Sequence, residues 1–396
     1  MTVTTLKATN FRNFSEILLS PSPKVNVLYG DNAQGKTNLI EAIWLFSGAH
    51  SFRGSKDSEF IKFDQKFCRL ELEFQGRKNT NTATIAISTT KQATLNGVKL
   101  DSASELNGNF SSVVFSPDHL DLVKAGPQNR RNFIDSAINE ILPRHNASIL
   151  EYRELLRQRN ALLKDIPLHS ELLDTLPVWN EKIAQSGARI IFTRLRYLKR
   201  LSKKANEVYD GIASKILENN SVAAENKINK NNSDFKSERL NISYFPDGID
   251  VGEYPENIND PHIVIPKIYE TLKKHLKYQE KNEIELGYTK IGPHRDDIEI
   301  TIEGLSSRLF ASQGQQRSIV LSLKLAEATL LKETIGESPV LLLDDVMSEL
   351  DRFRQNYLLN HIDGFQVFIT CCDPSGLKEL KGGSIFEIEK GRIISR

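Results

Sequence analysis

Short apolar runs with strand or helix spacing predict a mixed α/β chain. Residues 25–29 form an apolar run that ends at a glycine, and this pattern predicts a strand. A helix is predicted over 36–46, because Leu39, Ile43 and Phe46 recur at the spacing of one helix face. A glycine-containing loop separates the two, so the first predicted unit is strand, loop and helix.

A region rich in strand signals follows, up to about residue 100. Its clearest feature is the pair Asn96-Gly97 between two short apolar stretches, which is typical of a two-residue hairpin turn. Helical spacing and charge dominate from about 118 to 209. The stretch 219–262 is rich in Asn, Ser, Lys and Glu, and we predict a poorly packed excursion there with a short strand near 242–245.

Ordered patterns return in the last third of the chain. A β-like run is predicted at 298–302, and a helix over 318–332. Residues 340–343 are four consecutive apolar residues, which indicates a parallel strand buried on both faces. Another buried strand is predicted at 366–370.

Composition narrows the classes of function without selecting one. The chain has 396 residues, of which 39% are hydrophobic, enough for two or three domains. Its net charge is +1, so any nucleic-acid site must be a local patch. The three cysteines lack metal-ligand spacing, and we find neither a signal-peptide pattern nor an apolar run long enough to cross a membrane. We therefore expect a reduced, cytoplasmic protein.

The loop before the first predicted helix matches a phosphate-binding motif. Residues 30–37 fit G-x-x-x-x-G-K-[ST], with a strand before and a helix after. Amides of such a loop and the helix N-terminus surround phosphate oxygens. Lys36 is expected to reach the β- and γ-phosphates of ATP, and the Thr37 hydroxyl to hold Mg²⁺. The predicted nucleotide-binding residues of this segment are Gly30, Asp31, Asn32, Ala33, Gln34, Gly35, Lys36, Thr37 and Asn38.

Two carboxylates follow the buried strand at 340–343. Because open α/β sheets bind ligands at the carboxyl ends of their strands, Asp344 and Asp345 should lie at the nucleotide. We predict that Asp344 serves Mg²⁺ and that Asp345 orients or deprotonates the attacking water, so these two and Lys36 are the predicted catalytic residues. The plain alternative is two solvated acids in a loop. Many ABC proteins have a switch histidine at the position of Thr370. We therefore predict only a weak interaction between Thr370 and the γ-phosphate.

Lys36 and Asp344 are separated by most of the chain, yet they must meet at one Mg²⁺. We therefore predict an α/β fold of the P-loop NTPase class, an ABC/SMC-like ATPase head with a β-rich N-terminal part and an inserted, mainly helical second domain. The predicted domains are 1–117 and 286–396, which together form the ATPase, and 118–285, the inserted domain.

A second phosphate grip is predicted ahead of the helix at 318–332. A divergent ABC signature, of the form found in SMC-like heads, is matched by Ser312, Gln313, Gly314 and Gln315. Two grips on one chain suggest an ATP-dependent homodimer in which each subunit grips the other's ATP. The D-loop of such proteins, at the dimer seam, is matched by Ser348, Glu349, Leu350 and Asp351. The alternative for both segments is a simple helix N-cap.

These motifs, with others along the chain, resemble the RecF family of bacterial DNA replication and repair proteins. The most specific are Gly292-Pro293-His294-Arg295-Asp296-Asp297 and the segment 343–351. The remaining similar segments are 6–14, 30–37, 114–120, 124–127, 130–135, Tyr152 with 158–160, and 312–317. This chain has Asp118-His119 where Glu-Asp is usual, and 219–262 has no counterpart in the pattern.

The resemblance implies a lobed ATPase head with a helical second domain and no long coiled coil. It implies binding of ATP and Mg²⁺, ATP-dependent dimerisation, binding to double-stranded or gapped DNA, and slow, DNA-dependent hydrolysis. It also implies action with RecO and RecR to load the recombinase RecA in recombinational repair, replication restart and the SOS response. Arg12 and Asn13, in the segment 6–14, are expected at the nucleotide through this resemblance.

A basic helix face is the leading candidate for DNA contacts. One side of a predicted helix carries four basic residues, Arg196, Lys199, Arg200 and Lys203, while another side is apolar. Arg130 and Arg131 form a second candidate. Instead of contacting DNA, the four residues of the helix face could simply be exposed to solvent. Arg130 and Arg131 could instead form an ion pair with Asp135 or another acid. His294 is expected to stabilise its turn rather than bind a metal.

The motifs also admit two other functions. An ABC transporter ATPase subunit would have both nucleotide motifs, but it would carry a Leu-Ser-Gly-Gly-Gln signature, which this chain lacks. A structural scaffold could keep the motifs without hydrolysing ATP. Association with the membrane fraction would identify the first, and absence of ATP turnover with and without duplex DNA would identify the second.

Overall fold

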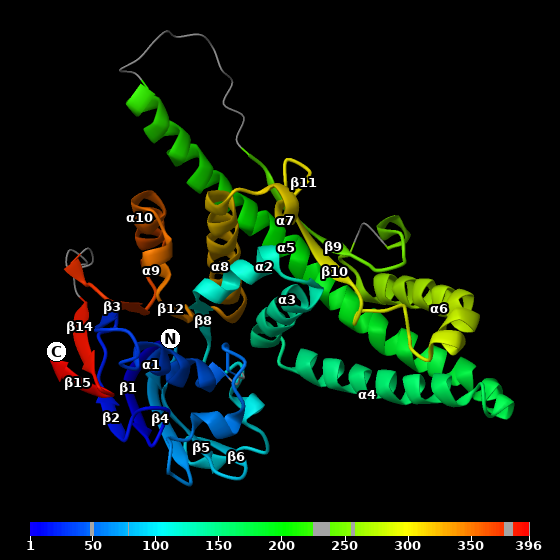
Figure 1. The fold of residues 1–396 in the computed structure, drawn as a ribbon, viewed down its shortest axis with the longest axis horizontal. Coiled ribbons are helices and arrows are strands. Elements are labelled where there is room, and N and C mark those ends of the chain that lie inside the picture. The colour runs from blue at the N-terminus through cyan, green and yellow to red at the C-terminus, as the bar shows by residue number, and fades with distance from the viewer. Residues whose placement is uncertain (48–50, 78, 225–237, 255–257, 376–382, 396) are drawn as a thin grey trace. The chain divides into compact units, whose positions relative to one another are not determined.

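The structure is a computed structural model that describes residues 1–47, 51–77, 79–224, 238–254, 258–375 and 383–395. The chain forms two compact units, each drawn from separate parts of the sequence, and Figure 1 labels their elements. Unit 1 consists of Met1–Leu120, Val208–Ser237 and Gln313–Arg396. Unit 2 consists of Asp121–Glu207 and Glu238–Ser312.

Unit 1 contains an antiparallel sheet in the order β2-β1-β4-β5-β6-β7. Its strands are β1 (Thr2–Thr9), β2 (Glu16–Leu19), β4 (Cys68–Gln75), β5 (Thr80–Ile87), β6 (Lys91–Leu95) and β7 (Val98–Lys99). Alternate residues of β4 are buried, as expected of a sheet with one face on a core. The predicted hairpin is confirmed, because Asn96 and Gly97 join β6 to β7 and both have the positive φ of a type I′ turn.

A second sheet of unit 1 has the order β15-β14-β3-β13-β12-β8. Its strands are β3 (Val25–Tyr29), β8 (Ser112–Phe115), β12 (Val340–Leu343), β13 (Val367–Cys371), β14 (Ser384–Glu389) and β15 (Arg392–Ser395). All are parallel except β15, which pairs antiparallel with β14 at the edge. Every residue of β8, β12 and β13 is buried, as expected of parallel strands covered on both faces.

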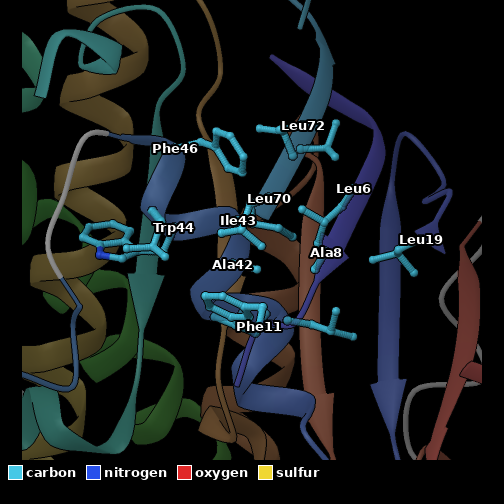
Figure 2. Packing of buried hydrophobic residues seen from close by; sticks show 14 of the residues in the cluster. Leu6, Ala8, Phe11, Leu19, Ala42, Ile43, Trp44, Phe46, Leu70 and Leu72 are labelled. Carbon is cyan, nitrogen blue, oxygen red and sulfur yellow. The ribbon is translucent and has the colours of Figure 1, made fainter. Parts of the chain in front are cut away.

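The core of unit 1 joins the two sheets through helix α1 (Lys36–Trp44). Figure 2 shows side chains of β1, β4 and α1 gathered in one cluster, among them Leu6, Ala8, Leu70, Leu72, Ala42 and Ile43. The same cluster contains Leu28 of β3, Leu342 of β12 and Phe368 of β13. Because burial of one such large side chain contributes roughly 1.5–3 kcal/mol, α1 is fixed firmly against both sheets.

The other α-helices in the described part of unit 1 are α8 (Gln313–Ile335), which precedes β12, α9 (Val346–Glu349) and α10 (Arg352–His361), which follow it, and the last part of α5 (Leu176–Ala224) from Val208. Short 3₁₀ helices are η1 (Leu45–Ser47), η2 (Asp57–Phe60), η3 (Ala103–Leu106) and η4 (Pro117–Leu120).

Unit 2 is mainly helical, with a small sheet in the order β11-β10-β9. Its helices are α2 (Asp121–Lys124), α3 (Pro127–Ile141), α4 (Arg144–Asp165), α6 (Pro261–Leu286), α7 (Ser307–Phe310) and the first part of α5 (Leu176–Ala224). Its 3₁₀ helices are η5 (Ser170–Thr175) and η6 (Val251–Glu253). Its strands are β9 (Leu240–Phe245), β10 (Asp297–Ile302) and β11 (Leu305–Ser306).

The elements predicted from hydrophobic spacing are confirmed within a few residues. The predicted strands 25–29 and 340–343 match β3 and β12 residue for residue. The predicted helix over 36–46 is α1, which changes to the 3₁₀ turn η1 after Trp44. The predicted fold class, an ABC/SMC-like P-loop head of mixed α/β structure, fits the parallel sheet with its strand–loop–helix unit.

The boundaries of the two units differ from those predicted for the inserted domain, 118–285, and for the C-terminal part of the ATPase, 286–396. β10 pairs with β9 over 297–302, so the chain up to Ser312 belongs to the helical unit. Val208 belongs to unit 1, and its carbonyl oxygen accepts a hydrogen bond of 3.2 Å from the Tyr357 hydroxyl of α10. The expected poor packing of 219–262 is wrong for β9, where Tyr244 is buried. Residues 225–237 and 255–257 of that stretch lie outside the described residues.

Candidate nucleotide site

The predicted phosphate-binding loop connects β3 to α1 at the carboxyl end of the parallel sheet. Gly30 has φ 145°, and a Cβ atom there would lie 2.3 Å from the carbonyl oxygen of Ile388. Gly35 has φ 113°, and its Cβ would lie 2.6 Å from Asn13 Nδ2. Both positions therefore require glycine for space as well as for backbone conformation. Between them, Asp31, Asn32 and Ala33 are exposed.

Lys36 is buried in this loop and its ammonium group lies among polar atoms. Nζ donates to the carbonyl oxygens of Gly30 and Asp31, the latter at 2.9 Å. It also lies 3.8 Å from Sγ of Cys372, whose thiol donates to Asn32 Oδ1 at 3.3 Å. A positive charge is thus held at the centre of the loop, where phosphate oxygens bind in proteins with this motif.

Asp344 meets the loop from the end of β12. Its Oδ1 atom accepts hydrogen bonds from the hydroxyls of Thr37, at 2.8 Å, and Thr370, at 2.9 Å. Burial raises the pKa of the Asp344 carboxyl, and the two hydroxyl donors oppose that rise. The structure therefore brings together a loop hydroxyl, a strand-end carboxylate and a threonine from residues that are distant in sequence.

Asp345 differs from its neighbour in both conformation and exposure. It is exposed, and it has φ 52°, a left-handed conformation that aspartate tolerates better than most residues. Its backbone amide donates to Thr370 Oγ1 at 2.8 Å. Thr370 therefore ties the two adjacent acids together, a role that sequence reasoning did not give it.

Asn13 and Asn38 support the loop from outside. Asn13 Nδ2 donates to the carbonyl oxygen of Gln34 at 2.9 Å, and its Oδ1 accepts from Asn38 Nδ2 at 2.8 Å. In this structure the two side chains brace the loop, while direct nucleotide contact by either stays a prediction.

Arg12 is held by a buried acid that sequence reasoning missed. Its guanidinium lies 2.8 Å from Oε2 of Glu41, a fully buried side chain on α1, and donates to Ser55 Oγ at 2.7 Å. The same side chain lies over the ring of Phe60. The only sequence signal for this network is an acid within the apolar run that ends α1. Nucleotide contact by Arg12 stays a prediction.

The predicted signature and D-loop lie at helix starts. Ser312 and Gln313 are exposed where α8 begins, and Gly314 lies in its first turn. The Ser348 hydroxyl donates to the carbonyl oxygen of Asp345 at 2.7 Å. Asp351 caps α10 by accepting from the Arg354 amide at 2.9 Å, so the N-cap alternative holds for this residue. A cap and a role at a dimer seam are compatible.

The two candidate DNA sites differ in accessibility. Arg130 is buried and forms a two-pronged ion pair with Asp297, each contact 2.8 Å long, which favours the structural alternative for this residue. Arg131 is half-buried and donates to the carbonyl oxygen of Asp296 at 2.6 Å. By contrast, four exposed cations lie on α5 and are called the basic face of α5 below: Arg196, Lys199, Arg200 and Lys203.

His294 stabilises its turn, as expected. The Tyr152 hydroxyl donates to Nδ1 at 2.8 Å, and Nε2 donates to the carbonyl oxygen of Thr289 at 3.1 Å. Burial lowers the pKa of His294 to about 4, so the ring is neutral at physiological pH. Among the described residues, His, Cys, Asp and Glu form no cluster suited to a metal ion.

A search of the helices in the described parts of the chain finds none that is long and apolar enough to cross a membrane.

Comparison with known proteins places the whole chain. The family described as RecF/RecN/SMC N terminal domain matches residues 2–390. The DNA replication and repair protein RecF of Caldanaerobacter subterraneus subsp. tengcongensis is 37% identical, covering 97% of both chains. The protein of the same name from Alkaliphilus oremlandii is 36% identical, covering 99% of this chain and 100% of its own.

Solved structures similar to this chain include the same kind of protein as the similar sequences. A structure of the recombination mediator protein RecF-ATPrS in the RecFOR pathway has a TM-score of 0.83 and 35% identity, over 99% of this chain and 97% of that chain. An SMC head bound to the C-winged helix domain of ScpA shares the fold, with a TM-score of 0.52 at 13% identity over 99% and 96% of the two chains. The chain therefore belongs to the RecF family, within the RecF/RecN/SMC group of ATPase heads.

Proposed function

We propose that this chain binds ATP with Mg²⁺ at the loop between β3 and α1 and hydrolyses it slowly. The observation that carries the proposal is the hydrogen bond of 2.8 Å between Thr37 Oγ1 and Asp344 Oδ1. This contact joins the phosphate-binding loop to a strand-end carboxylate from far along the chain, as a metal–nucleotide site requires. The solved RecF structures that are named with ATP and ATPrS support the choice of nucleotide.

Thr37 and Asp344 would hold Mg²⁺, together with phosphate oxygens and water. Both side chains offer hard oxygen atoms, and a site with few protein ligands suits an ion that keeps several waters. When bound, the ion neutralises charge on the phosphates. Lys36 is proposed to bind the β- and γ-phosphates, and the exposed Asp345 to orient the attacking water.

Two such sites are proposed to form between two copies of the chain. Each ATP would be held by Lys36 of one subunit and by Ser312, Gln313, Gly314 and Gln315 of the other. The exposure of Ser312 and Gln313 at the start of α8 supports this arrangement, because a grip on another subunit's nucleotide must be accessible. The D-loop residues, Ser348 to Asp351, would lie at the same seam.

The proposed ATP cycle serves DNA repair. DNA, double-stranded or gapped, is proposed to contact the basic face of α5, whose charges suit backbone phosphates. DNA is proposed to stimulate the otherwise slow hydrolysis. Action with RecO and RecR to load the recombinase is proposed from family membership and from the naming of a RecFOR pathway for a similar structure.

Two substitutions of adjacent acids test the ATPase. Asp344→Asn should weaken Mg²⁺-dependent ATP binding, while Asp345→Asn should spare binding, block hydrolysis and trap an ATP-bound dimer. Ser312→Arg should leave ATP bound to a monomer. Sedimentation with saturating ATP, and turnover with and without duplex DNA, measure these outcomes. An Asp345→Asn protein that stays monomeric with ATP, or a Ser312→Arg protein that dimerises, would refute the sandwiched nucleotide.

A further inference from the structure

Two arginines connect the first turns of α8 to the D-loop segment Ser348–Asp351. Arg317 of α8 donates from Nη2 to Glu349 Oε2 at 2.9 Å. Arg354 of α10 donates from Nε to Ser318 Oγ of α8 at 2.9 Å. The same guanidinium forms an ion pair with Asp351, so one side chain bridges a residue of α8 and a residue of the D-loop.

Arg354 also lies against the glycine of the predicted signature. A Cβ atom on Gly314 would lie 3.2 Å from Arg354 Nη2, which is tighter than an ordinary van der Waals contact. The φ of Gly314 is not in the left-handed region that favours glycine. A side chain at this position would therefore press on the guanidinium of Arg354 and displace it slightly.

Packing between α8 and α9 is incomplete, so the two arginine contacts contribute more to holding these segments together. A cavity of about 40 Å³ lies between apolar side chains of the two helices, including Leu321 and Val346. Leu350 of the D-loop lines the same cavity, as do Arg317 and Glu349. Side chains on either side of a void lose their mutual dispersion contacts. The arginine bridges therefore fix the D-loop against α8 where close packing does not.

Stability alone gives little reason for a cation at the position of Arg354. The N-terminus of a helix carries a partial positive charge, so a guanidinium beside the first turn of α8 is disfavoured by the helix dipole. Its ion pair with Asp351, whose carboxylate is half exposed, contributes little in solvent. What the arrangement does provide is a defined distance between the two segments.

We propose that Arg354 is a positioning residue for the ATPase. It fixes the position of the signature residues, at the start of α8, relative to the D-loop. Both segments can then contact the ATP of the partner subunit at the same time. Arg317 and Glu349 form a second bridge with the same effect. The inference rests on the proposed sandwiched dimer. The side chain of Arg354 bonds to Ser318 and Asp351, and not to the nucleotide-site residues Lys36, Thr37 or Asp344, so we expect nucleotide binding by a single subunit to be independent of it.

The test compares Arg354→Gln and Arg354→Lys with Arg352→Gln. Arg352 is exposed on the same helix and serves as the matched control. Arg354→Gln should keep the ATP affinity of the monomer, lower kcat about tenfold or more, and raise the ATP concentration needed for dimerisation, because misplacement of a catalytic segment by about 1 Å is costly. Arg354→Lys keeps the charge but cannot bridge Ser318 and Asp351 with a planar fork, so it should recover little activity. Arg352→Gln should behave as wild type.

Exchanging the charges of the bridge between Arg317 and Glu349 tests the positioning role independently of Arg354. Arg317→Glu and Glu349→Arg should each lower kcat, and the double exchange should restore part of it, whereas a general loss of stability would not be rescued. Melting temperatures of all variants identify any that unfold. If wild type dimerises with ATP and Arg354→Gln matches it in dimerisation and kcat, or if Arg354→Lys restores full activity, the positioning role is overturned. If wild type itself stays monomeric with ATP, the proposed dimer is what fails.

Discussion

The buried ion pair between α4 and α6 allows a quantitative prediction for unit 2. Arg159 and Glu283 have fully buried side chains, and their Nη2 and Oε2 atoms are 2.7 Å apart. Arg159 also donates to Thr289 Oγ1 at 2.6 Å and to Asn180 Oδ1. Glu283 accepts from the amide of Lys290 at 2.7 Å. Each charge is thus surrounded by partners, and removal of either one leaves the other buried without its counter-charge.

Single and double substitutions should therefore differ sharply. Arg159→Met or Glu283→Leu should each destabilise unit 2 by about 3–5 kcal/mol, because one uncompensated charge stays buried. Arg159→Met combined with Glu283→Leu removes both charges but leaves the Asn180 oxygen without its donor and the Lys290 amide without its acceptor, at a cost of about 1–3 kcal/mol each. The double variant should therefore lose much less stability than the sum of the two single losses, with a coupling energy of roughly 3 kcal/mol.

Denaturant unfolding measures this coupling. Trp179 lies in unit 2, and with Trp44 replaced by Phe it is the remaining tryptophan, so its fluorescence follows that unit. Arg157→Gln is the matched control, because its ion pair with Glu154 on the same helix is exposed to solvent and should contribute little to stability. Additive losses, with the double variant as unstable as the sum of the two single variants, would refute this account.

Four further results are expected. Lys36→Met should abolish tight ATP binding without changing the circular dichroism spectrum, and unaltered affinity would contradict the assignment of the loop. Because burial raises the pKa of Asp344 and the metal needs the ionised carboxylate, Mg²⁺-dependent ATP affinity should fall as the pH is lowered through that pKa; titration calorimetry at several pH values should show this loss in wild type and not in Asp344→Asn. Charge reversal of the basic face of α5 should weaken DNA binding and flatten its dependence on salt, and an unchanged slope would place the DNA site elsewhere. Gly30→Ala should lower ATP affinity, since its Cβ would collide with the Ile388 carbonyl, and normal binding would show that the loop can shift to accept it.

Local signals allowed much of the ATPase core to be predicted from sequence. The four apolar residues 340–343 indicated β12 because a strand buried on both faces leaves no polar positions, and Asp344 followed at its end. The limits of the units could not be predicted in this way. The membership of 297–302 depends on its pairing with β9, a contact between segments far apart in sequence that no local pattern encodes.

Buried polar networks were the other feature beyond the reach of pattern reasoning. Glu41 is an acid buried on the core side of α1, and only the fold shows that Arg12 compensates its charge. Arg130 and Arg131 were considered together as DNA candidates, yet Arg130 is buried on Asp297 while Arg131 remains half-buried. Adjacent residues on a helix point about 100° apart, so the direction of each side chain becomes decisive only when the neighbouring elements are in place.

The two adjacent acids show how sequence and structure reach a related conclusion through different physics. Their place after the strand at 340–343 predicted a metal role for Asp344 and a water role for Asp345, and the alternation of side chains along a strand would point the two in opposite directions. In the structure β12 already ends at Leu343. What separates the two acids is the left-handed backbone at Asp345, which turns the chain into α9 while Asp344 stays buried against Thr37 and Thr370. A buried carboxylate bonded to hydroxyls suits a fixed metal, and an exposed one suits a mobile water. The proposed division of labour therefore rests on this turn, and a substitution that altered the backbone at Asp345 should disturb both roles together.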